Sequence, residues 1–166
     1  MFRIRRVHDD LLPTNLHAIE QVQALMRDRF PDVRQSEIDG LPGKLRDPHT
    51  SKLRSILWVA EGSAGELRGF AYAKHASDVR LFWLDFISAT RDGRGGIGAA
   101  LYQRVRESAR QLDVPGIFME CLPDERDQCS SDAAFKENVA RMRFYERFGA
   151  RPIIGSNWQL ELPNAE

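Results

Sequence analysis

The stretch Gly93-Arg94-Gly95-Gly96-Ile97-Gly98-Ala99 decides how the rest of this chain is interpreted. Four glycines within six positions give up backbone entropy that a simple connecting turn would keep. A main chain without side chains lets an anion approach closely, and the N–H groups of a helix's first turn can donate hydrogen bonds to it. The stretch therefore predicts a turn between a strand and a helix that binds the phosphate of a ligand. A tight turn with no ligand is the alternative.

Apolar runs on both sides of this turn predict an antiparallel meander followed by a parallel unit. The runs before it predict strands at residues 56–60, 67–74 and 79–87. Turns as short as those between them are typical of antiparallel hairpins. After the turn, apolar residues at i, i+4 spacing predict a helix that begins near Ile97 and ends before Pro115. A strand at 117–122 follows, and the order strand, helix, strand implies a right-handed parallel crossover.

Two helices are expected near the start of the chain. Either Thr14 or Asn15 should cap the first helix, and Pro31 should end it. Ser36 should open a second, shorter helix, which the glycines and proline of residues 40–43 break early. The first helix carries an apolar stripe that should face the core, at Leu16, Ile19, Val22, Leu25 and Met26.

The two ends of the chain predict further elements. Residues 2–7 alternate weakly, as in a short strand. A last helix should cover about residues 134–148 and end at Gly149 in a left-handed cap. Residues 153–154 and 158–162 then predict a terminal hairpin.

Length and composition bound the function. A chain of 166 residues suits one domain over residues 1–166. Its formal net charge is zero, without the clustered basic excess of a nucleic-acid-binding protein. No segment suits a signal peptide or a membrane span, which predicts a cytoplasmic protein without a membrane partner. The two cysteines, Cys121 and Cys129, and four histidines without paired spacing predict no metal site.

The glycine turn also suggests a rival hypothesis. Residues 93–98 match the spacing G-x-G-x-x-G of a dinucleotide fingerprint, and Glu120 follows where a ribose-binding acid is expected. A nicotinamide-dependent oxidoreductase is therefore an alternative. Against it, residues 88–92 separate the strand from the turn, and that strand ends an antiparallel meander. Only one strand–helix–strand unit follows, so the second mononucleotide-binding half is missing.

Two motifs resemble a known family. Residues 96–101, Gly-Ile-Gly-Ala-Ala-Leu, resemble the acetyl-CoA-binding turn of the GNAT superfamily of N-acetyltransferases, written Gln/Arg-x-x-Gly-x-Gly/Ala. Residues 138–150 resemble that family's late motif, an asparagine followed seven residues later by a tyrosine and then by a glycine. In one departure from the pattern, Gly93 stands where the family has Gln or Arg, and Arg94 follows one place later. With the meander and the early helices, the resemblance spans most of the chain.

The resemblance implies a fold and a co-substrate. The fold is a GNAT-like α+β mixed sheet, an antiparallel meander followed by a βαβ unit, with helices on both faces. The co-substrate is acetyl-CoA, whose pyrophosphate the main chain of the turn would bind. Its thioester would lie along the third strand, and its pantetheine arm would bind Asn138. The implied cofactor-binding residues are Phe86, Ile87, Ser88, Gly93, Arg94, Gly95, Gly96, Ile97, Gly98, Ala99, Asn138 and Tyr145.

The catalytic residues follow partly from the resemblance and partly from the chemistry. By resemblance, Tyr145 is the acid that protonates the departing sulfur, and a core tyrosine is the alternative. A lysine-type amine is mostly protonated at neutral pH, so a base must take its proton. Asp85 and Glu120 are the candidate bases, because a carboxylate inside an apolar strand is costly unless paired or functional. A salt bridge is the alternative for each. His75 is a third candidate, expected to be an exposed residue at a strand end.

Together these observations predict an acyltransferase. It would move an acetyl group from acetyl-CoA to a primary amine by direct attack within a ternary complex. The acceptor would be a small-molecule or peptide amine, and a homodimer is left open. The alternatives are the dinucleotide-dependent oxidoreductase and a module that binds acyl-CoA without catalysis.

Overall fold

A computed structural model describes residues 1–47, 52–90 and 96–155 of the chain. The chain divides into two compact units, the first over Met1–Met119 and the second beginning at Glu120. A single domain over the whole chain stays a prediction.

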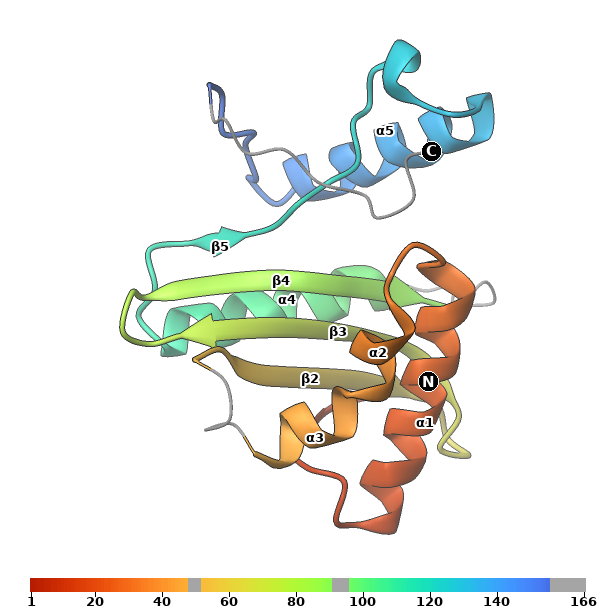
Figure 1. Cartoon of the computed structure of the whole chain (residues 1–166), viewed down its shortest axis with the longest axis vertical. Helices are drawn as coiled ribbons and strands as arrows, with labels where there is room; N and C mark the ends of the chain where they lie inside the picture. Colours follow the sequence, from red (N-terminus) through yellow and green to blue (C-terminus); the bar gives the residue numbers. More distant parts are fainter. Residues whose placement is uncertain (48–51, 91–95, 156–166) are drawn as a thin grey trace. The chain divides into compact units, whose positions relative to one another are not determined.

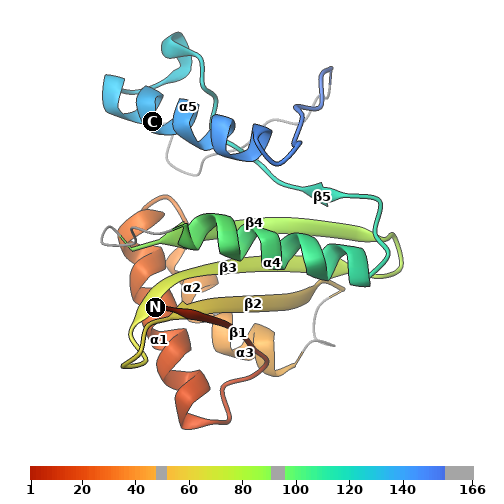
Figure 2. The same ribbon diagram turned by 180° about the vertical axis from the view of Figure 1, so that it is seen from behind.

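The first unit is built on one mixed sheet (Figures 1 and 2). Its strands are β1 (Arg3–Val7), β2 (Arg54–Glu61), β3 (Leu67–Ala76), β4 (Leu81–Ala89) and β5 (Ile117–Phe118). They lie in the order β1-β2-β3-β4-β5. The first four pair antiparallel, and β5 pairs with β4 in parallel. The predicted meander and the parallel crossover are therefore confirmed.

Helices cover both faces of the sheet, as predicted. One face carries α1 (Pro13–Arg29), α2 (Gln35–Asp39) and α3 (Leu41–Arg46), which lie in front of the sheet in Figure 1. The other face carries α4 (Ile97–Gln111), which lies in front of the sheet in Figure 2. The α+β prediction with helices on both faces is confirmed.

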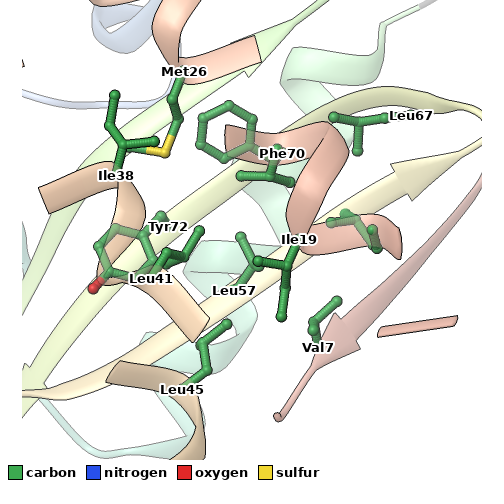
Figure 3. Close-up of a cluster of buried hydrophobic side chains, with 13 residues drawn as sticks. Val7, Ile19, Met26, Ile38, Leu41, Leu45, Leu57, Leu67, Phe70 and Tyr72 are labelled. Carbon is green, nitrogen blue, oxygen red and sulfur yellow. The ribbon is translucent and has the colours of Figure 1, made fainter. Parts of the chain in front are cut away.

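The main core lies between the sheet and the first three helices (Figure 3). Ile19, Val22 and Met26 of α1 are buried there, at the i, i+3, i+7 spacing that places them on one helix face. Burying a side chain as large as that of Phe70 stabilises a fold by about 1.5–3 kcal/mol. The sheet and the two shorter helices contribute Val7, Leu57, Val59, Leu67, Phe70, Tyr72, Ile38, Leu41 and Leu45.

Small residues let α4 approach the opposite face closely. Gly69, Ala71 and Ala73 alternate along β3, so they share the face that α4 covers. Four apolar residues of α4 are buried against that face, Ile97, Leu101, Val105 and Ala109, which confirms four positions of the predicted stripe.

The start of α1 differs from the prediction. The helix begins at Pro13, with Leu12 at the cap position and no side-chain capping bond. Proline suits the first helical position because its missing N–H would have no helical partner there. Asn15, predicted as a cap, is buried inside the first turn, where its Oδ1 accepts a bond of 2.6 Å from Arg5. Leu16 was expected in the core but is 41% exposed.

The glycines and proline of residues 40–43 end the second helix early, as predicted, because α2 stops at Asp39. A further helix that was not predicted, α3, then begins at Leu41. Pro42 stands in the first turn of α3, where it interrupts no helical hydrogen bond. Leu41 and Leu45 are buried on one side of α3, so tertiary burial offsets the weak helix propensity of this segment.

Two strands are displaced or shortened relative to the prediction. β4 begins at Leu81 because residues 77–80 form a turn in which Arg80 has a φ of 53°. β5 covers only Ile117–Phe118 of the predicted strand at 117–122. Residues 153–154 are exposed and not in a strand, and 158–162, the other half of the predicted hairpin, lie outside the described residues.

The second unit is organised around α5 (Asp132–Glu146), preceded by a 3-10 turn at Arg126–Gln128. Ser131 caps this helix, since its side chain accepts a bond of 3.1 Å from the N–H of Ala134. Gly149, with a φ of 87°, adopts the left-handed conformation predicted for it. Among the described helices of both units, none combines the length and the apolar character needed to cross a bilayer.

Replacing Gly69 with alanine should destabilise the first unit. The new Cβ would lie 2.7 Å from Ser88 O and 3.1 Å from both Ala89 Cα and Ile97 Cγ2. Main-chain atoms cannot rotate away, so we expect the free energy of unfolding to fall by about 1–3 kcal/mol, as in other overpacked sites. Urea denaturation measures this loss. Gly43→Ala is the control because nothing lies within 4 Å of its Cβ. Wild-type stability in Gly69→Ala would contradict the close packing.

Candidate functional site

The outer edge of β4 is the first part of the site. The ladder between β4 and β5 joins Phe82 to Ile117 and Trp83 to Phe118, and it ends there. β4 itself continues to Ala89. Within the described residues, no strand pairs with this edge of β4 beyond Trp83.

The register with β3 determines which main-chain groups of β4 face that edge. The N–H of Thr90 donates to Arg68 O at 2.9 Å, so these two residues form a hydrogen-bonded pair. In an antiparallel ladder such pairs alternate, and the residues between them turn their N–H and C=O groups outward. Ile87 and Ala89 therefore direct these groups to the open edge. Ser88, between them, faces β3.

A bulge in β4 lies just before this segment. Tyr72 pairs with Phe86, but the next residue of β3, Ala73, pairs with Leu84. Asp85 is therefore the extra residue of the bulge. Because a bulge redirects the strand and its side chains, Asp85 and Phe86 both lie on the face covered by α1 and α2.

Phe86 contributes an aromatic wall on that face. Its ring lies 5.0 Å from the ring of Phe30 and 6.3 Å from that of Tyr72, measured between centroids. Ile87 and Ser88 are half-buried. All three residues stand where the sequence analysis expected the thioester to lie, with Ile87 as the one whose N–H points to the open edge.

The first turn of α4 is the second part of the site. Gly96 caps this helix in the left-handed conformation, with a φ of 78° and no side-chain capping bond. The first helical bond runs from the N–H of Ala100 to Gly96 O at 2.9 Å. The N–H groups of the three residues between them precede that bond, so they have no partner within the helix. These are the predicted anion donors Ile97, Gly98 and Ala99. The predicted binding residues Gly93, Arg94 and Gly95 lie outside the described residues.

Asp85 forms an ion pair, which was the alternative interpretation for this residue. Its Oδ2 lies 2.6 Å from Lys74 Nζ, and both side chains are largely buried. Burial acts to lower the pKa of Lys74, but the hydrogen bond and charge of Asp85 outweigh it and raise that pKa. The ammonium is therefore charged at neutral pH, and Asp85 is not a free base here. A cation two residues after a core tyrosine, within an apolar run, is the sequence signal that could have identified Lys74.

His75 differs from the expectation of an exposed strand end. It is buried, with its ring 6.2 Å from that of Phe82. Burial, together with the charge of Arg54, lowers the pKa of His75. It directs its side chain to the α4 face, whereas Asp85 lies on the opposite one.

Asn138 of the second unit is buried and holds the preceding loop to α5. Its Nδ2 donates to Pro123 O at 2.8 Å and to Cys129 Sγ at 3.7 Å. Its Oδ1 accepts a bond of 3.1 Å from Arg141. Both amide protons are therefore used inside this unit, and a bond to pantetheine would use the remaining acceptor capacity of Oδ1 or replace one of these contacts.

Tyr145 and Glu120 also belong to the second unit. Tyr145 is buried on α5, with its ring packed edge-on against Phe144 at 5.2 Å. Glu120 is exposed and lies beyond the end of β5, so the argument from a carboxylate inside an apolar strand was wrong. The reason is that β5 ends at Phe118, earlier than its apolar sequence suggested.

Neither metal binding nor thiol chemistry is indicated by the described residues. They contain no group of three or more His, Cys, Asp or Glu side chains placed to hold a metal ion. Burial, with a smaller contribution from Asp124, raises the pKa of Cys121, so this thiol stays protonated at neutral pH.

Breaking the Lys74–Asp85 pair on one side should destabilise the first unit. Lys74→Met leaves a largely buried carboxylate uncompensated, which should lower the free energy of unfolding by about 1–3 kcal/mol, less than for a fully buried pair. Combining Asp85→Leu with Lys74→Met should restore most of the lost free energy of unfolding. Because the pKa of Lys74 is raised, the pair stabilises the fold at neutral pH and loses this effect as the pH rises through that pKa. Urea titrations of the three proteins measure both effects, and equal stabilities would contradict the pair's contribution.

Comparison with known proteins gives the fold. No protein-family model and no curated protein sequence matches the chain. A ribosomal-protein-alanine N-acetyltransferase from Brucella melitensis has a TM-score of 0.61 at 16% identity, over 97% of this chain and 99% of that one. A GNAT-family acetyltransferase from Staphylococcus aureus has 0.62 at 15%, over 95% and 90%. An aminoglycoside N-acetyltransferase in complex with CoA has 0.64 at 15%, over 97% and 95%. The chain therefore has the fold of the GNAT superfamily of N-acetyltransferases.

Proposed function

We propose that this protein is an N-acetyltransferase that moves an acetyl group from acetyl-CoA to a primary amine. One observation carries the proposal. Within the described residues, the outer edge of β4 has no strand partner beyond Trp83, and β4 precedes a helix whose first N–H groups lack helical partners. An extended, amide-containing arm that ends in a pyrophosphate is complementary to both parts.

Main-chain groups would hold most of the co-substrate. The outward N–H and C=O groups of Ile87 and Ala89 would pair with the amides of pantetheine, as one strand pairs with another. The first turn of α4, from Ile97 to Ala99, would donate to the pyrophosphate, together with Gly93, Arg94 and Gly95. Asn138 would contact pantetheine through its oxygen. Main-chain donors and acceptors would therefore supply much of this binding.

The reaction would be direct attack in a ternary complex. The amine nitrogen would bond to the thioester carbon, and the N–H of Ile87 would donate to the oxyanion that develops. The carbon–sulfur bond would then break, with Tyr145 protonating the departing sulfur. Asp85 and Glu120 are the proposed bases. For Asp85 to accept a proton, the Lys74 ammonium has to share or leave its carboxylate.

The same ion pair favours a second candidate function. A carboxylate that is already bound by a cation is a poor base, so the chain could bind acyl-CoA without turning it over. The oxidoreductase hypothesis loses support, because in the part of the chain that the structure describes the sheet has one parallel pair, in the order β1-β2-β3-β4-β5, and no second mononucleotide-binding half.

A ligand-dependent melting temperature tests co-substrate binding. A ligand that binds only the folded chain stabilises it by about 2.7 kcal/mol at a hundred times its Kd. We therefore expect acetyl-CoA to raise the Tm by several degrees, and NAD or NADP to leave it unchanged. The opposite pattern would reverse the order of the two hypotheses. No shift with any of them would remove the proposed function.

Release of free coenzyme A with a panel of amines and peptides tests catalysis. Tyr145→Phe should lower kcat by about a hundredfold or more if the phenol is the acid, while acetyl-CoA still raises the Tm. Tyr102→Phe is the matched control, since it removes a phenol from the body of α4. Turnover at the wild-type rate in Tyr145→Phe would exclude this acid. Binding without turnover of any amine would favour the non-catalytic module.

A further inference from the structure

The carbonyl group of Ala89 marks the outer edge at the end of β4. Thr90 bonds to Arg68 across the ladder with β3, and Ala89 precedes it. Because hydrogen-bonded and non-bonded pairs alternate, Ala89 turns its oxygen away from β3 and toward the open edge. This is the edge along which the co-substrate is proposed to lie.

Arg29 of α1 contacts this carbonyl group. It is the last residue of α1, and its Nη2 donates to Ala89 O at 3.4 Å. This distance is long for a hydrogen bond, so the contact is weak.

The guanidinium of Arg29 is only partly satisfied. Its Nε is buried but has no hydrogen-bond partner in the described structure. Asp28 Oδ2 lies 3.4 Å from Nε, which is an ion-pair distance without hydrogen-bond geometry. The side chain as a whole is 27% exposed, so a ligand can reach it. A buried donor without an acceptor is unfavourable, and the exposed part of a guanidinium suits a phosphate, because its planar N–H groups can donate to two phosphate oxygens.

Packing holds the end of α1 in this position. The next residue, Phe30, packs its ring 5.0 Å from that of Phe86 on β4 and 6.5 Å from that of Phe70 on β3. The N–H of Phe30 still bonds to Met26 O at 2.9 Å, which closes the helix. The aromatic contacts of Phe30 therefore hold the end of α1, and with it Arg29, beside the end of β4 without a ligand.

The first turn of α4 lies close to the same point. A Cβ placed on Gly69 would lie 3.1 Å from both Ala89 Cα and Ile97 Cγ2. Ala89, whose carbonyl contacts Arg29, and Ile97, the first residue of α4, therefore both lie against Gly69. This places the end of Arg29 on the same corner of the sheet as the helix N–H groups.

The sequence supplies a reason for such an arrangement. The family resemblance places a Gln or Arg at the start of the turn, but Gly93 occupies that position here. We propose that Arg29 provides a further cationic side chain that binds the pyrophosphate of the acyl-CoA, beside the N–H groups of the first turn of α4. This inference rests on the proposed function, since it assumes that acyl-CoA is the ligand.

Calorimetric binding to a series of coenzyme fragments tests the proposal. Arg29→Gln should weaken binding of coenzyme A and of 3′-dephospho-coenzyme A by about ten- to a hundredfold, the effect of losing a charge-assisted hydrogen bond. It should leave the affinity for pantetheine, which has no phosphate, unchanged. Arg29→Lys should retain part of the affinity, because a point charge still attracts phosphate. Arg27→Gln is the matched control, since Arg27 pairs with Asp39 at 2.7 Å instead.

The possible outcomes distinguish a failure of the Arg29 assignment from a failure of the proposed function. Wild-type affinity for 3′-dephospho-coenzyme A in Arg29→Gln would overturn the assignment, including the case in which only binding of the 3′-phosphate is weakened. An equal loss for pantetheine would also overturn it, because it would indicate a disturbed β4 edge. The melting temperatures of both Arg29 variants without ligand show whether they fold. If the wild-type protein bound none of these compounds, the proposed function itself would fail.

Discussion

The ladder between β4 and β5 ends at Trp83, and the functional interpretation depends on this early end. Main-chain groups inside a sheet are normally satisfied by the neighbouring strand, so an edge that continues for six more residues to Ala89 offers donors and acceptors to something else. The ladder with β3 determines that Ile87 and Ala89 present their main-chain groups outward, because Thr90 and Arg68 form a hydrogen-bonded pair and such pairs alternate. Main-chain donors and acceptors therefore form the basis of the proposed site, and side chains add to them.

Close packing around Gly69 joins the two halves of that backbone site. The main chain of β4 and the first side chain of α4 approach this residue so closely that even a methyl group would collide with them. The open edge therefore leads directly to the helix N–H groups and their partial positive charge. On the other face, Phe30 and Phe86 hold the end of α1 at the same corner. The positions of the α4 N–H groups and of the end of α1 at this corner therefore depend on packing against both faces of one sheet.

Contacts in space change the interpretation of two predicted residues, Asp85 and Asn138. Asp85 was selected because a carboxylate in an apolar strand needs a partner or a function, and Lys74 supplies the partner. Asn138 shows the same ambiguity, since its contacts hold the loop of the second unit to α5. Sequence position identified these residues as exceptional without distinguishing the two reasons. Only the residues that surround a side chain in the folded protein distinguish a structural role from a catalytic one. A buried polar group needs a partner in either case.

The sequence alone determined the meander, the parallel crossover, the glycine cap of α4 and the left-handed Gly149, because each follows from local periodicity or from a backbone conformation that favours glycine. Burial overrode local signals elsewhere. It formed α3 over a glycine–proline segment, while β5 paired for only two residues of a longer apolar run. The partner of Asp85 and the position of Arg29 beside Ala89 depend on contacts between residues far apart in the chain. Only the tertiary structure decides such contacts, because no short-range pattern records which side chains meet across a sheet.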